Sequence, residues 1–91
     1  LRVLDIGAGS GFFARTCVHL GHAAVALDRE GNDAFRDVCR WLGVDRRAHE
    51  ITAFAPLPPL GGRFDVVTAF LLNFDRFAER GYAPWGVAEW R

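Results

Sequence analysis

The first 28 residues alternate two short apolar runs with one amphipathic segment, and this alternation constrains the fold more than any other feature. Residues 2–6 and 23–28 are apolar and rich in strand-forming side chains. Residues 12–20 lie between them and predict a helix with one buried stripe. The stripe consists of Phe13, Cys17 and Leu20. Strand, helix and strand in this order predict a βαβ unit with two parallel strands.

A second helix is predicted after this unit. Asn32 or Asp33 has the side chain of an N-cap, and Gly43 ends the helical pattern. The apolar side chains recur at i, i+3, i+4 and i+7, which predicts a single buried face. They are Phe35, Val38, Cys39 and Leu42.

The rest of the chain continues the alternation with weaker signals. Residues 47–54 predict a short strand, and residues 64–72 predict a buried one. The segment 56–62 between them is rich in proline and glycine and predicts an irregular loop. Residues 73–85 predict a second loop, and residues 87–91 predict the first turn of a helix.

These elements predict an α/β fold, namely a Rossmann-like, doubly wound parallel sheet with three α/β/α layers. Its 91 residues suffice for one domain, 1–91, and about four strands are present, so the sheet is expected to be incomplete. Leu1 already belongs to a strand, and we expect both ends of the chain to be cut. In such sheets the ligand lies at the carboxyl ends of the strands.

Composition excludes several kinds of chemistry. The 11 basic residues are all arginine, which excludes a P-loop lysine, a Schiff-base lysine and a lysine nucleophile. They balance 11 acidic residues, so net charge indicates neither nucleic acid nor membrane as a partner. There is no apolar run of roughly 18 residues and no signal-peptide pattern, and two cysteines without a pairing framework fit a reducing compartment. We therefore expect a cytoplasmic protein.

A glycine-rich segment follows the first predicted strand. Gly7, Gly9 and Gly11 alternate with small residues, and Asp5 precedes the first glycine by two positions. The segment resembles motif I of class I S-adenosylmethionine-dependent methyltransferases, an acidic residue followed by Gly-x-Gly-x-Gly between the first strand and the first helix. Glycines at these positions allow a ligand to approach the main chain. The resemblance implies S-adenosylmethionine as cofactor, bound by these residues and by Ala8.

The competing interpretation is a dinucleotide site. Its Gly-x-Gly-x-x-Gly fingerprint requires a third glycine at position 12, where this chain has Phe12. The carboxylate of Asp5 would also repel a pyrophosphate in a partly desolvated site, whereas it suits a sulfonium and an ammonium group. The charge pattern therefore favours the methyl donor.

Asp28 ends the second predicted strand, 17 residues after Gly11. It matches the acidic residue that accepts hydrogen bonds from the ribose hydroxyls in the methyltransferase family, with Arg29 beside it. A carboxylate offers two acceptor oxygens to a diol. Dinucleotide enzymes use an acid at the same place, so Asp28 alone does not separate the two cofactors.

Two phenylalanines complete the predicted cofactor site. The loop after the third strand has Ala53 where the family often has an adenine-binding aspartate, so Phe54 is expected to stack on the adenine. Residues 64–67, Phe-Asp-Val-Val, resemble the family's fourth strand, which places Phe70 near the methyl group. An alternative role for Phe54 is a place in the core.

The function implied by the resemblance is transfer of a methyl group to an acceptor, for which a small molecule is favoured. No catalytic residue is predicted, because a general base is needed only if the acceptor loses a proton during attack. No metal site is predicted, since Cys17, His19 and His22 lack a fourth ligand at suitable spacing. Two alternatives stay open: an NAD(P)-dependent oxidoreductase, and a non-catalytic half-domain.

Overall fold

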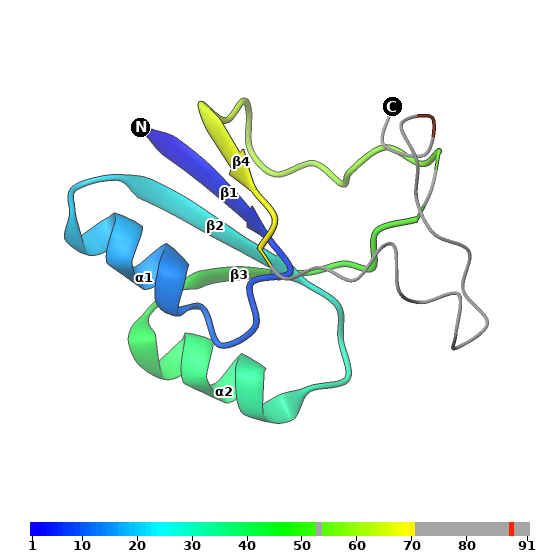
Figure 1. Ribbon diagram of the computed structural model, residues 1–91. Helices are drawn as coiled ribbons and strands as arrows, with labels where there is room; N and C mark the ends of the chain where they lie inside the picture. The colour runs from blue at the N-terminus through cyan, green and yellow to red at the C-terminus, as the bar shows by residue number, and fades with distance from the viewer. Residues whose placement is uncertain (53, 71–87, 89–91) are drawn as a thin grey trace.

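Within the part of the chain that the structure describes, four strands form one all-parallel sheet that packs with helices α1 and α2, which confirms the predicted incomplete Rossmann-like α/β fold (Figure 1). The computed structural model describes residues 1–52, 54–70 and 88. Its elements are β1 (Arg2–Ile6), α1 (Phe12–His19), β2 (Ala23–Asp28), α2 (Asp33–Leu42), β3 (Asp45–Ala48) and β4 (Val66–Thr68). Apart from Ala88, the predicted loop at 73–85 and helix at 87–91 lie outside the described residues. No helix within the described part is long and apolar enough to cross a membrane.

The strand order is β3-β2-β1-β4, and every neighbouring pair is parallel. The chain therefore moves outward from β1 to β3 and then returns to the other side of β1 as β4. Arg2 pairs with Ala23 and Ile6 with Leu27, so β1 and β2 end at the same level. The reversal of strand order lies between β1 and β4, and ligands of open α/β sheets bind at this switch point.

Both helices lie on one face of the sheet (Figure 1), and that face is built from small side chains. The buried cluster beneath the helices consists of Val3, Ala14, Cys17, Ala24 and Ala26. The predicted stripe on α1 is therefore wrong in two of its three members, because Ala14 and Cys17 are buried whereas Phe13 and Leu20 are 38% and 68% exposed. Small residues on the sheet let α1 approach closely, and only its narrow Ala14–Cys17 side fits there.

Gly11 fixes the point at which α1 begins. It has a left-handed backbone, with φ +82°, and an ideal Cβ built on it would lie 2.7 Å from the Sγ atom of Cys39 on α2. The side chain of Val44 lies 3.4 Å from the same position. A larger residue would therefore be strained and would push α2 away.

The second helix agrees with its predicted ends. The Oδ1 atom of Asn32 accepts a hydrogen bond from the Phe35 amide at 3.1 Å, so Asn32 rather than Asp33 is the N-cap. Gly43 follows the helix as its C-cap. Of the predicted buried face, only Cys39 is fully buried, while Phe35 is 38% exposed.

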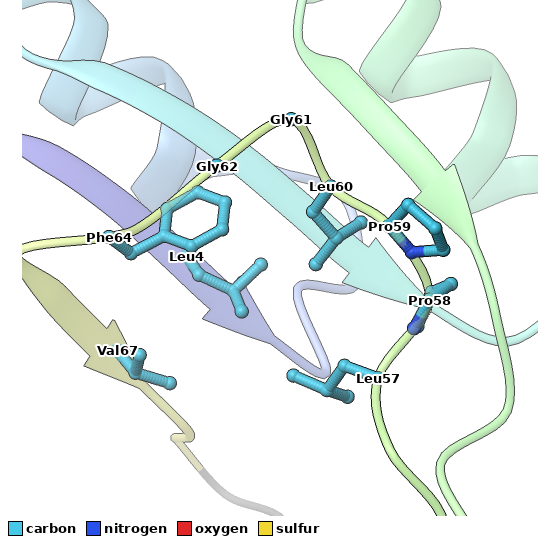
Figure 2. A pocket seen from close by; sticks show the side chains of 9 residues that line it. All are labelled: Leu4, Leu57, Pro58, Pro59, Leu60, Gly61, Gly62, Phe64 and Val67. Carbon is cyan, nitrogen blue, oxygen red and sulfur yellow. The ribbon is translucent and has the colours of Figure 1, made fainter.

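The other face of the sheet is covered by the connection between β3 and β4, which carries no helix over residues 54–65. Leu60 from this connection packs on Leu4, Ile6, Val25 and Leu27. Figure 2 shows Leu60 lying over the strands beside Leu4 and Phe64. Arg2 holds the connection in place: its guanidinium donates to the carbonyls of Leu60 at 2.8 Å and Arg63 at 2.9 Å and stacks 4.2 Å from the Phe64 ring.

The third strand begins and ends earlier than predicted, at Asp45–Ala48 rather than 47–54. Strand β2 provides pairing partners only as far as Asp28, which pairs with Ala48. The His49 amide then donates to the Asp28 carbonyl at 2.8 Å, after which the chain leaves the sheet. Ile51, which lies within the predicted strand, packs instead on the core cluster of the second face.

The fourth strand is also shorter and more exposed than predicted. Only Val66–Thr68 pair with β1, and Val66 and Val67 are 39% and 57% exposed. Among the described residues β4 is at the edge of the sheet, so it has a neighbouring strand on one side only. Phe64 precedes the strand, in the connection, and packs on the core cluster that contains Leu60, while Leu71 and Leu72 lie outside the described residues.

Replacing Gly11 with alanine is expected to lower the free energy of unfolding by about 2–4 kcal/mol. About 1–2 kcal/mol of this comes from the left-handed backbone and the rest from the contact with Cys39. Gly21→Ala is the matched control, because Gly21 has φ +90° but no atom within 4 Å of the ideal Cβ. Urea denaturation should show a larger loss at Gly11, and Cys39→Ala should recover part of it. Equal losses at the two glycines would contradict the packing role.

Candidate functional site

Asp5 lies at the switch point and is the only buried acidic residue among those described, at 3% exposed. Thr68, its partner on β4, donates a hydroxyl hydrogen bond to the Asp5 Oδ1 atom at 2.7 Å. Burial raises the pKa of Asp5 above its ordinary 3.8, the Thr68 hydrogen bond opposes this, and the negative charge of Asp28 raises it further. The two carboxylates are therefore close enough to influence one another.

Asp28 joins the end of β2 to the glycine-rich loop. Its Oδ2 atom accepts from the Gly9 amide at 2.8 Å, and its Oδ1 atom accepts from the Arg29 amide at 2.8 Å. Each oxygen of a carboxylate has a second lone pair, so both can accept a further hydroxyl hydrogen bond. Asp28 thus holds the loop and keeps the capacity to bind a diol.

Three other amides of the loop also donate hydrogen bonds within the protein. The Gly7 and Ala8 amides donate to the Leu27 carbonyl at 2.7 and 3.3 Å, and the Gly11 amide donates to the Ala8 carbonyl at 3.0 Å. With Gly9 bonded to Asp28, four amides of the segment 7–11 have internal acceptors. Loops that cradle phosphate direct such amides at the ligand instead.

The two carboxylates and the loop residues 7–9 line an open cleft of about 1210 Å³, which we call the switch-point cleft. Its volume exceeds the roughly 300–1,000 Å³ of typical ligand pockets, so a cofactor would fill only part of it. The described lining includes four acidic residues and a single arginine, Arg29. The acidic residues are Asp5, Asp28, Glu30 and Glu50. A cleft with this charge balance attracts cations and repels anions.

Three phenylalanines belong to the apolar part of the cleft lining. Phe13 and Phe70 meet edge to face, with ring centroids 5.1 Å apart and planes at 78°. The ring of Phe35 comes within 3.8 Å of an ideal Cβ on Gly9. All three side chains are at least 38% exposed, which leaves ring surface free to contact a ligand.

Most of the predicted cofactor-binding residues come together in this cleft. Those that line it are Asp5, Gly7, Ala8, Gly9, Asp28, Arg29 and Phe70. Gly11 instead packs against α2, and Phe54 is 72% exposed, has φ +63° and is not among the described lining residues. The structure therefore does not bring Phe54 to the other predicted residues.

Sequence reasoning missed the residues that follow β3. His49, Glu50 and Ile51 line the cleft directly after the strand. Placing the strand at 47–54 moved its carboxyl end six residues too far along the chain. The fold rule for strand ends would have indicated His49 and Glu50 had the strand been ended at Ala48. Among the described residues, no group of three or more His, Cys, Asp or Glu side chains is arranged to hold a metal ion.

The raised pKa of Asp5 predicts a pH dependence of stability. The folded protein binds this proton more tightly than the unfolded chain, so the contribution of Asp5 is fully present below pH 3.8 and is lost as the pH rises through its folded pKa. The pKa of Asp45 is lowered, chiefly by its hydrogen bond with Arg47. Its contribution to stability is therefore present above pH 3.8 and is lost as the pH falls through its folded pKa.

Urea denaturation across this pH range is the measurement. Asp5→Asn should gain stability relative to the wild type as the pH rises, and the gain should level off above the folded pKa. Thr68→Val should move the transition to higher pH, because it removes the hydrogen bond that lowers the Asp5 pKa. A difference between wild type and Asp5→Asn that does not vary with pH would contradict the assignment.

Comparison with known proteins adds no assignment. No protein-family model matches the chain, and neither a curated protein nor a solved structure matches it significantly. The function must therefore be inferred from the residues of the switch-point cleft and from the motif they carry.

Proposed function

We propose that the chain is the cofactor-binding part of an S-adenosylmethionine-dependent methyltransferase and that the cofactor binds in the switch-point cleft. The observation that carries the proposal is the charge of that cleft at the glycine-rich loop. A buried carboxylate, Asp5, lies beside a loop in which four of the five amides of residues 7–11 have internal acceptors, and a second carboxylate, Asp28, holds the loop. Such a site favours a cationic ligand over a phosphate.

The residues of the cleft fit the parts of this cofactor. The sulfonium and the α-ammonium group are cations, which suit the wall formed by Asp5. The ribose diol suits the remaining lone pairs of Asp28. The loop residues 7–9, with Arg29 and Phe70, complete the set that would hold the cofactor, and Phe13 and Phe35 add apolar surface.

The cofactor supplies the electrophilic methyl group. The protein's own part is to orient the two reactants and to exclude water from between them. The proposal names no general base, since one is required only for an acceptor that loses a proton. A small molecule is the favoured acceptor.

A dinucleotide-dependent oxidoreductase would require a different loop. Its pyrophosphate needs amides that point outward and surroundings without negative charge, whereas here four of the five amides of residues 7–11 have internal acceptors and two carboxylates lie close by. Asp28 would serve the ribose of either cofactor and does not discriminate. No feature of the described cleft favours the oxidoreductase.

Calorimetric titration tests the proposed cofactor. S-adenosylhomocysteine should bind saturably, and NADH should not. Asp28→Asn should weaken binding by about 10- to 100-fold, because it removes the charged acceptor of the diol while keeping an oxygen for Gly9. Asp37→Asn on the exposed side of α2 is the matched control and should bind normally. Binding of NADH alone would overturn the proposal in favour of the oxidoreductase, and binding of neither by the folded protein would favour a non-catalytic half-domain.

A second titration isolates the role of Asp5. S-adenosylmethionine and S-adenosylhomocysteine differ by one methyl group and one positive charge, so a negative site should distinguish them. Asp5→Asn is expected to reduce the affinity for S-adenosylmethionine about 10-fold more than that for S-adenosylhomocysteine. Thr68→Val, titrated at a pH above its own Asp5 transition so that the carboxylate stays charged, should leave the ratio of the two affinities unchanged. An equal loss for both ligands would show that Asp5 does not recognise the sulfonium.

A further inference from the structure

Arg46 lies in the middle of β3 and is only partly exposed. It pairs with Ala26, whose side chain belongs to the cluster beneath the helices, so Arg46 also faces α2. Its Nη2 atom donates to the Arg29 carbonyl at 3.0 Å. Its Nε atom is buried and has no hydrogen-bond partner in the described part of the chain. A buried, unsatisfied donor destabilises a fold, so stability alone does not account for an arginine here.

The carbonyl that accepts the Arg46 hydrogen bond belongs to Arg29, the residue that follows Asp28. Arg29 is held from two sides, because its carbonyl accepts from Arg46 and its amide donates to the Asp28 Oδ1 atom. The second oxygen of Asp28 accepts from the Gly9 amide. A continuous chain of hydrogen bonds therefore runs from β3 through the turn after β2 to the glycine-rich loop.

The charges of Arg46 and Asp28 both influence the pKa of the nearby Cys39 thiol. Burial raises the pKa of Cys39, the positive charge of Arg46 lowers it, and the negative charge of Asp28 raises it. Arg46 and Asp28 therefore both lie within electrostatic reach of Cys39, whose Sγ atom is 3.6 Å from the Gly9 carbonyl.

We propose that Arg46 is a positioning residue, which fixes the turn after β2 so that the Asp28 carboxylate stays oriented toward both the Gly9 amide and the ligand diol. The part of this inference that concerns the diol rests on the proposed function. The part that concerns the Gly9 hydrogen bond does not, since it is a property of the protein without ligand.

Arg46→Met tests the inference in the full chain, with Arg47→Met as the matched control. Methionine keeps most of the length of the side chain but removes the guanidinium. Arg47 is the next residue on the same strand, faces the opposite side of the sheet and pairs on the surface with Asp45 at 2.7 Å. The first measurement is hydrogen exchange of the Gly9 amide. We expect Arg46→Met to speed this exchange about 10-fold relative to Arg47→Met.

The second measurement compares S-adenosylhomocysteine with its 2′,3′-dideoxy analogue, which has no diol. Arg46→Met should weaken binding of the first about 10-fold and of the second by less than about twofold. The melting temperature should stay the same or rise, because the variant removes an unsatisfied buried donor.

Each result decides the inference. Unchanged exchange of the Gly9 amide overturns it, and so does an equal loss of affinity for the two ligands. A fall in melting temperature with no selective effect on Gly9 assigns Arg46 a merely structural role and also overturns it. If the wild type does not bind S-adenosylhomocysteine, the proposed function fails, while the Gly9 exchange still decides whether Arg46 positions Asp28.

Discussion

The hydrogen bond between the Asp28 carboxylate and the Gly9 amide is the interaction on which the candidate site depends. It joins the end of β2 to the loop that leaves β1, so the two strand ends and the start of α1 form one unit. The same bond removes an amide that a phosphate would otherwise use. One contact therefore holds the shape of the loop and occupies an amide that could otherwise bind an anion.

The small residues beneath the helices explain how this contact is maintained. Alanines on β2 let α1 and α2 lie close to the sheet, and Gly11 lets α2 bring Cys39 against the first turn of α1. Gly11, at the end of the loop 7–11, is thereby buried against the second helix, while residues 7–10 stay partly exposed. A loop held by internal hydrogen bonds loses less conformational entropy on binding a ligand than a free loop would.

Local signals predicted the elements whose ends are marked by glycines or caps. The bounds of β1 and β2 agree with prediction, and Asn32 and Gly43 enclose α2 as expected. Predictions that depended on the extent of pairing were wrong. β3 stops at Ala48 because β2 has no further residues to pair with, and α1 turns its Ala14 side to the sheet because the opposing surface is small. Neither partner is adjacent in sequence, so no local pattern contains that information.

The sequence by itself determined the parallel α/β class, the glycine-rich loop after β1 and the two acidic residues at strand ends. These follow from apolar periodicity and from residue types that a tight turn requires. Only the tertiary structure decided which residues meet. It placed His49 and Glu50 in the cleft, left Phe54 exposed and used Gly11 for helix packing. It also brought the guanidinium of Arg46 to the carbonyl of Arg29, because the contacts of a strand side chain depend on which neighbouring strands and helices pack around it.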